Sequence, residues 1–415
     1  MTGKSSFVWT VLSGCVYALS SVVFLMVVSH HLGDTAAGVY SAASMIAMQL
    51  ITVGRFSVRS FQVSDVNDEY SFSEYFSFRV LTCLVMLVAL LVWGLVGGYR
   101  GESLVIVLAF GIYKVCDAMA DVFEGQLQRR SRLDVAGRCQ CLMNLSLIAV
   151  FILGVFISGN LMTATILLAV GAVLFLPAFY LPAFRRYGGT DTGMLKLSLS
   201  GRSLRGLFDG CIALFVSSFL YSFMNNVPRY AIRKLYDGEE GVILLGHFTE
   251  LFTPVFAVDL LAGFTMRLWL TPMAEAYDRR DGASFGKKKW AQLGIIAGIT
   301  LAACLFAYTL GGPVLSWLYG TDLTAYAPEL TLLMAAGGFV AVETLYENIV
   351  TIYRGQKHTL WINPVTILSG SVLLIFLVRA FGIRGAAVGY LIMTALRAVG
   401  FAILANLLKQ RFRNS

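Results

Sequence analysis

Ionisable side chains recur at helical spacing inside stretches of the chain that are otherwise apolar. Lys114, Asp117, Asp121, Glu124 and Gln128 follow one another at i, i+3, i+7, i+10 and i+14, which places all five on one narrow stripe of a helix. In a membrane span, an ionised side chain that faces lipid costs roughly 2.5 to 3.5 kcal/mol, whereas each strongly apolar residue gains only about 0.3 to 0.6. The stripe must therefore face protein or water. Two functional interpretations are that the stripe lines a polar cavity or forms a path for a coupling ion. Two structural alternatives are a row of salt bridges and a helix end that reaches the headgroups near Glu124.

Four more acids lie in other apolar stretches. Glu343 and Glu347 form a second i, i+4 pair, while Glu250 and Asp259 flank Pro254. A proline inside a span leaves backbone groups that other groups must satisfy. We therefore predict either a kinked gating helix or a purely structural bend at Pro254, with all four acids as candidate cavity or coupling groups.

Arginines at the ends of apolar stretches point to the class of substrate. Arg55 and Arg59 are spaced i, i+4 at the end of one stretch, and Arg229 and Arg267 lie near the ends of two others. A guanidinium makes bidentate contacts with phosphate, and these are strong where water is excluded. We predict phosphate contacts at these four residues; the alternative is that they snorkel to the headgroups or set the topology.

The elements that carry these residues are predicted to be membrane-spanning helices. The chain of 415 residues is 57% hydrophobic and 13% charged, whereas soluble domains are about 25% charged. Its apolar blocks have the length of about 20 residues that crosses a bilayer. Twelve spans are expected, at about 7 to 29, 36 to 54, 79 to 98, 103 to 124, 139 to 158, 161 to 184, 210 to 232, 242 to 268, 290 to 311, 329 to 353, 358 to 379 and 384 to 408.

The distribution of positive charge orients these spans. Most of the 32 lysines and arginines fall on the side that holds the N-terminus, so the positive-inside rule predicts a multi-pass protein with both termini in the cytoplasm. This topology explains the net charge of +8 without a nucleic-acid partner. The partners expected from the spans themselves are membrane lipids.

The chain is expected to divide into two halves. A glycine-containing connection at 188–209 separates an N-terminal lobe, 1–187, from a C-terminal lobe, 210–415. The predicted fold is an all-α integral membrane protein with twelve transmembrane helices in two six-helix lobes around a central cavity, because transporters are commonly built from two such repeats. The seven cysteines and four histidines show no metal-ligand spacing, so neither a metal nor a cofactor is expected.

Several stretches resemble the polysaccharide flippases of the multidrug/oligosaccharidyl-lipid/polysaccharide superfamily, the Wzx-like O-antigen and capsule exporters. They are LGDTAAGVYSAA from Leu32, RSFQVSDVNDEYSFSEYFSFR from Arg59, YKVCDAMADVFEGQLQRRSRLDVAGR from Tyr113, NNVPRYAI from Asn225 and FGIRGAAVGYLI from Phe381. The resemblance covers nearly the whole chain. It departs from the related lipid II flippases, which carry arginines in the first helix and have two extra helices.

The resemblance implies a MATE-like bundle in the bacterial cytoplasmic membrane that flips an undecaprenyl-pyrophosphate-linked oligosaccharide by alternating access. Its substrate would be a repeat unit of O-antigen (lipopolysaccharide), capsule or exopolysaccharide. A proton or sodium gradient would supply the energy for transport, and other proteins of polysaccharide biosynthesis would be its partners. By the same resemblance Asn225 joins Arg229 as a substrate-binding candidate, together with Arg55 and Arg59 and the segment from Lys114 to Arg132.

Two other functions are weighed against the flippase. A cation-coupled multidrug or metabolite antiporter on the same bundle would use Asp117 or Asp121 for coupling. A membrane glycan polymerase or ligase would need a long outward loop with catalytic groups, but the outward connections predicted here are short, and no nucleophile elbow or zinc-binding HExxH occurs. We therefore predict a transporter and no enzymatic activity.

Overall fold

The computed structural model describes residues 2–65, 68–188, 197–198, 200–353, 355 and 359–413, apart from the side chains of 2–4, 264, 267, 268, 359–362 and 410–413. Every regular element in these ranges is a helix. The chain folds into two compact units, Met1–Phe223 and Met224–Ser415. The division between them lies inside α8 (Gly201–Leu235), so residues 201–209 of the predicted connection are the first turns of this helix.

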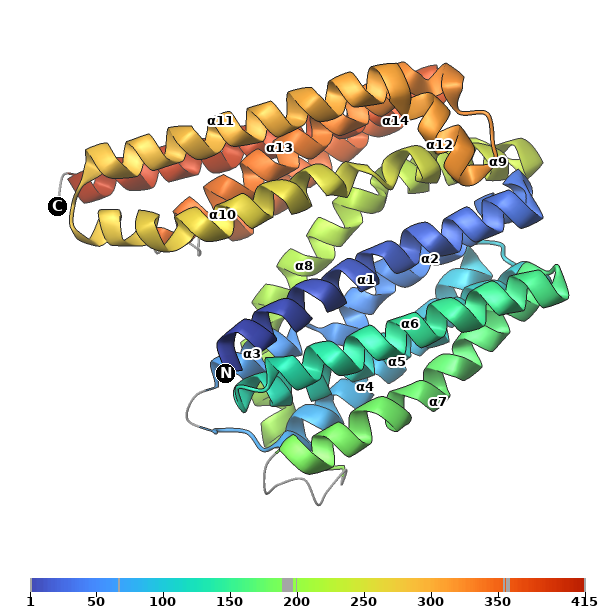
Figure 1. Cartoon of the computed structure of the whole chain (residues 1–415), viewed down its shortest axis with the longest axis horizontal. Helices are drawn as coiled ribbons and strands as arrows, with labels where there is room; N and C mark the ends of the chain where they lie inside the picture. The colour runs from blue at the N-terminus through green and yellow to red at the C-terminus, as the bar shows by residue number, and fades with distance from the viewer. Residues whose placement is uncertain are drawn as a thin grey trace. The chain divides into compact units, whose positions relative to one another are not determined.

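The first unit is a helical bundle organised around α5. Its helices are α1 (Thr2–Leu32), α2 (Asp34–Arg55), α3 (Val58–Ser64), α4 (Phe72–Val96), α5 (Glu102–Arg129), α6 (Leu133–Ser158), α7 (Leu161–Tyr187) and the first part of α8. α5 packs against α2, α3, α4, α6 and α7, while α1 lies along α6 (Figure 1). A polar side chain on α5 therefore meets protein on most sides.

The second unit is organised around α13 in the same way. It contains α9 (Gly238–Phe252), α10 (Val255–Asp278), α11 (Gly282–Phe306), the π-helical turn η2 (Ala307–Gly311), α12 (Gly312–Tyr319), the 3-10 turn η3 (Thr324–Tyr326), α13 (Ala327–Ile352) and α14 (Thr359–Arg413). α13 packs against α10, α11 and α14 (Figure 1).

The last helix, α14, is a hairpin of two spans. Its backbone leaves the helical region at Gly382, with φ 55° and ψ −130°, a conformation that is essentially restricted to glycine. Glycines then bring the two arms together, since an added Cβ at Gly370 would meet Met393, and one at Gly389 would meet Leu374. Eleven described helices are long and apolar enough to cross a membrane, with α14 counted once; the fold at Gly382 raises that number to the predicted twelve.

The surface of both units is apolar over long stretches. Large side chains such as Val88 on α4, Ile157 on α6 and Phe376 on α14 are 63%, 83% and 68% exposed. Exposed apolar surface on this scale is stable only in contact with hydrocarbon. The chain is therefore an all-α integral membrane protein, as its sequence predicts.

Helix ends differ most from the prediction where charges occur. The eighth span, expected at 242 to 268, is interrupted between α9 and α10 at Thr253 and Pro254, where the proline predicts a bend. α10 continues to Asp278, and α11 begins at Gly282 rather than near 290. An uncharged run of sequence ends at its first charged residue, whereas a helix continues through charged turns at the membrane surface.

Candidate functional site

The stripe predicted on α5 exists, and its acids are paired with cations from neighbouring helices. Arg55, at the end of α2, donates to an oxygen of Asp117 over 3.1 Å, and the other oxygen of Asp117 lies 3.4 Å from Nζ of Lys114. Asp121 lies 2.7 Å from Arg79 on α4 and 3.4 Å from Arg59 on α3. Ion pairs of these two acids thus connect α5 to α2, α3 and α4.

The last two residues of the stripe share Arg59. Its Nη1 lies 2.5 Å from a carboxylate oxygen of Glu124. Its Nε and Nη2 donate to the side-chain oxygen of Gln128 over 3.2 and 3.1 Å. Two tyrosines complete the arrangement, since Tyr180 on α7 donates to Glu124 over 2.6 Å and Tyr17 on α1 donates to Asp117 over 2.9 Å.

We call this group the charge cluster; it consists of Arg55, Arg59, Arg79, Lys114, Asp117, Asp121 and Glu124. Four cations face three acids, which leaves one positive charge in excess. Burial is uneven: the side chains of Arg55 and Arg59 are 36% and 31% exposed, the acids 13% or less, and Arg79 is fully buried. The most exposed side chains of the cluster are therefore those of two arginines.

A break in the backbone separates the two accessible arginines. Phe56 and Ser57 have φ values of 43° and 54°, a left-handed conformation that is strained for a side chain as large as phenylalanine. α2 ends at Arg55, and Arg59 belongs to α3. Arg55 and Arg59, predicted together at the end of one apolar stretch, therefore lie on two helices that this turn separates.

Neighbouring side chains support the break. Arg79 and Thr82 on α4 both donate to the carbonyl oxygen of Gly54, over 2.8 and 2.7 Å, and so satisfy a group near the end of α2. The ring of Phe56 stacks on that of Phe215 in α8, with centroids 4.2 Å apart. The end of α2 is thus fixed from two sides.

The second unit contains a separate set of predicted residues. Glu343 on α13 forms an ion pair with Arg397 on α14, and both side chains are buried. Asp259 on α10 accepts a hydrogen bond from Thr344 over 3.1 Å. Glu347, one turn beyond Glu343, is exposed. α13 therefore brings three of the four predicted acids into one region of this unit.

The remaining candidates of the second unit lie on other helices. Arg229 on α8 lies over the ring of Phe252, 4.8 Å from its centroid, and donates to Asn226 over 3.3 Å. Asn225 accepts from Tyr390 over 2.8 Å. Glu250 on α9 is fully buried. The predicted candidate Arg267 lies on α10, and its side chain is outside the part of the chain that the structure describes.

Four residues that take part in these ion pairs and hydrogen bonds were not predicted as site residues: Arg79, Arg397, Tyr17 and Tyr180. Arg397 could have been recognised, because a lone arginine in the middle of an apolar span needs an acidic partner. Arg79 begins a predicted span and so resembles an arginine that snorkels. Nothing in the local sequence distinguishes Tyr17 and Tyr180 from other interfacial or core tyrosines. Among the described residues, no group of three or more His, Cys, Asp or Glu side chains is arranged to hold a metal ion.

Comparisons with known proteins identify the fold. No family model matches the sequence, and no curated protein matches it. Solved structures match over almost the whole chain. The lipid II flippase MurJ in an inward closed conformation is 11% identical with a TM-score of 0.70, covering 96% of this chain and 87% of its own.

Two transporters of the superfamily are also similar. An inward-facing multidrug resistance MATE family transporter is 14% identical with a TM-score of 0.66, covering 94% of this chain and 95% of its own. A transporter from Pyrococcus furiosus, described as having a binding pocket of reversed polarity, is 14% identical with a TM-score of 0.58, covering 96% and 93%. The chain therefore has the fold of the multidrug/oligosaccharidyl-lipid/polysaccharide superfamily transporters.

Proposed function

We propose that the protein flips a pyrophosphate-linked lipid oligosaccharide across the bacterial cytoplasmic membrane. The observation that carries the proposal is the excess of cations in the charge cluster, whose most exposed side chains are those of Arg55 and Arg59. A pyrophosphate presents several anionic oxygens, which guanidiniums bind in bidentate fashion. The fold shared with a lipid II flippase supports the same class of substrate.

The charge cluster favours an anionic substrate over a cationic drug. Asp117, Asp121 and Glu124 each lie within 3.4 Å of a lysine or arginine. A carboxylate that is already neutralised by such a neighbour attracts a second cation only weakly. In an antiporter that exchanges cationic drugs for protons or sodium, one acid of the charge cluster would first have to separate from its lysine or arginine before it could bind the drug.

The acids of the second unit support a coupling step. Asp259 is hydrogen-bonded to a threonine hydroxyl, and Glu347 is exposed. We propose that these two residues, with Glu250 and Glu343, form the path of the driving ion, a proton or sodium. Arg229, Asn225 and Arg267 are proposed as further contacts of the substrate headgroup.

The proposed cycle is alternating access between two lobes, with both termini in the cytoplasm. The substrate would be a repeat unit of O-antigen, capsule or exopolysaccharide, delivered by enzymes that build it on the cytoplasmic face. Polysaccharide-assembly proteins would then consume the flipped product.

A genetic experiment separates the flippase from the antiporter. Deletion of the gene in its native host should abolish the surface polysaccharide and leave susceptibility to cationic drugs unchanged, and the intact gene should restore the polysaccharide. Drug sensitivity with normal surface polysaccharide would overturn the proposal in favour of the antiporter.

A reconstituted assay tests the headgroup directly. Proteoliposomes would contain a polyprenyl-pyrophosphate oligosaccharide, and a lectin added outside would report its transfer between leaflets. We expect transfer by the intact protein and loss of transfer when Arg55 and Arg59 are both replaced by Gln. Arg205→Gln is the matched control, because Arg205 is 86% exposed in a pair with Asp209 outside the cluster.

A further inference from the structure

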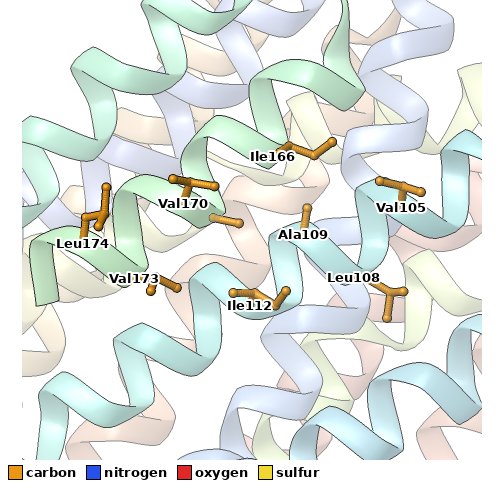
Figure 2. Close-up of a pocket in the computed structure, with 9 residues that line it drawn as sticks. Val105, Leu108, Ala109, Ile112, Ile166, Val170, Val173 and Leu174 are labelled. Carbon is orange, nitrogen blue, oxygen red and sulfur yellow. The ribbon is translucent and has the colours of Figure 1, made fainter.

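A hollow with aliphatic walls lies between α5 and α7 in the first unit. Side chains such as Val105, Ala109 and Ile112 from α5 line it together with residues of α7 (Figure 2), and its volume is about 420 Å³. At 3.6 residues per turn, this row on α5 points roughly 150° away from the stripe of the charge cluster. The hollow and the cluster therefore occupy opposite faces of one helix.

The hollow has a small floor and half-exposed walls. Ala109 and Ala169 are both 6% exposed, so the floor is formed by the smallest side chains of the lining. Ile112, Val170 and Val173 are 38%, 50% and 52% exposed. The hollow therefore opens toward the surface that faces hydrocarbon when the protein is in a membrane.

The length of the hollow is comparable to the thickness of the hydrocarbon in one leaflet. The lining runs from Val105 to Ile112 on α5 and from Ile166 to Leu174 on α7, about 11 to 12 Å along each axis at 1.5 Å per residue. Both runs begin within five residues of their helix starts, and the hydrocarbon core of a bilayer is about 30 Å thick. The hollow thus reaches from one membrane surface toward the midplane, parallel to the lipid chains.

We propose that this hollow binds one acyl chain of a membrane phospholipid from that leaflet. The lining residues offer no side-chain hydrogen-bonding group, so the occupant is hydrocarbon rather than a headgroup. A chain that lies between two helices touches protein on two sides and gains more dispersion contacts than a chain on a flat helix face.

The position of the hollow favours a resident phospholipid over the tail of a transported lipid. A headgroup held by the charge cluster lies on the other face of α5, toward α2, α3 and α4. A phospholipid headgroup instead stays at the membrane surface next to the starts of α5 and α7. The acyl-chain site is thus independent of the proposed function.

Photolabelling of the full-length protein tests the proposal. The protein would be reconstituted in vesicles that contain a phosphatidylethanolamine with a diazirine in one acyl chain, and labelled peptides would be mapped by mass spectrometry. We expect label in 105–112 and 166–174. Val170→Phe at the rim and Ala109→Phe at the floor should each reduce it about tenfold, the effect of displacing about two methylene groups.

Controls make the outcome decisive. Val88→Phe, at a 63% exposed site on α4 outside the hollow, should leave the label unchanged. Val170 is half-exposed, so its replacement leaves the core intact even if Ala109→Phe fails to fold. Equal labelling of the intact protein and Val170→Phe would overturn the proposal. Competition by polyprenyl phosphate, but not by unlabelled phospholipid, would also overturn it and assign the hollow to a polyprenyl chain.

Discussion

Arg397 on α14 and Glu343 on α13 form an ion pair in which the two side chains are only 2% and 3% exposed. Taking two charges out of water is costly, and their mutual attraction offsets that cost only while both are present. Each buried charge is therefore tolerated only because the opposite charge lies beside it.

Removal of one partner should destabilise the protein more than removal of both. Arg397→Leu leaves Glu343 buried without its cation, and we expect a loss of about 3 to 5 kcal/mol in unfolding free energy. The double variant with Glu343→Leu should recover most of it. Thermal unfolding in detergent measures both, and a double variant as unstable as the single one would contradict this account.

Asp121→Asn should destabilise the first unit. Asp121 lies 2.7 Å from Arg79, whose side chain is fully buried, so the neutral amide leaves a buried guanidinium without an acid. We expect a loss of about 2 kcal/mol or more in unfolding free energy. If Arg79→Met in the same chain restores stability, the pair is confirmed as the cause; a fully stable Asp121→Asn protein would show that the stripe is not structural here.

Arg229→Ala should abolish transport while the protein still inserts and folds. The guanidinium of Arg229 lies over the ring of Phe252, and one lost cation leaves the topology unchanged, because many other cations define it. The measurement is lectin-detected transfer in proteoliposomes, with gel filtration as the folding control. Arg384→Ala provides a comparison at another arginine of the second unit, and normal transfer by Arg229→Ala would exclude Arg229 from the site.

The loop after α3 should become less stable in acid. Burial by itself raises the pKa of Asp65, but the backbone amides of Glu69 and Tyr70, the hydroxyl of Tyr75 and the guanidinium of Arg129 outweigh burial, so this pKa lies below its usual range. The stabilisation is complete above the unfolded pKa of about 3.9. It is lost as pH falls through the lower folded pKa.

The corresponding measurement is the unfolding midpoint between pH 6 and pH 3. Asp65→Asn should lower the midpoint at pH 6 and reduce the further drop on acidification. Asp209→Asn is the control, because its partner Arg205 is largely exposed and exposed pairs contribute little. Identical pH profiles for the intact protein and Asp65→Asn would rule out this role.

Gly137→Ala should weaken the contact between α1 and α6. A Cβ at Gly137 would lie 2.7 Å from the carbonyl oxygen of Trp9, which belongs to a backbone that has little room to move. Overpacking of this kind costs about 1 to 3 kcal/mol. Gly14→Ala on α1 is the matched control, since nothing lies within 4 Å of its added Cβ, and it should be neutral or slightly stabilising. Unfolding midpoints compare the two.

The sequence predicted the class of fold and most of the charge cluster because both follow from the cost of charge in hydrocarbon. The twelve spans follow from it, as does the expectation that the face shared by Lys114, Asp117, Asp121 and Glu124 meets protein or water. The sequence could not predict which partner each acid meets, because the cation Arg79 and the hydroxyl donor Tyr180 come from other helices. Such pairing depends on packing between helices, which local periodicity does not encode.

The turn between α2 and α3 was also beyond prediction. Phe56 and Ser57 adopt a left-handed backbone that neither residue prefers, and the contacts that hold it come from Arg79, Thr82 and Phe215. The nearest glycine, Gly54, still lies within α2, and neither of the two turn residues is a glycine or a proline. Strained positions of this kind are determined by their surroundings.

The hairpin at Gly382 restricts how the sidedness of the protein can be mapped. The two arms meet through Gly370 and Gly389 and reverse within one residue, so a reporter inserted there would disrupt a tight turn that depends on glycine. In the turn from Gly320 to Leu323, which follows α12 and precedes η3, Asp322 is exposed although Thr321 and Leu323 are buried. A single cysteine at Asp322 would let an impermeant reagent establish which compartment this turn faces.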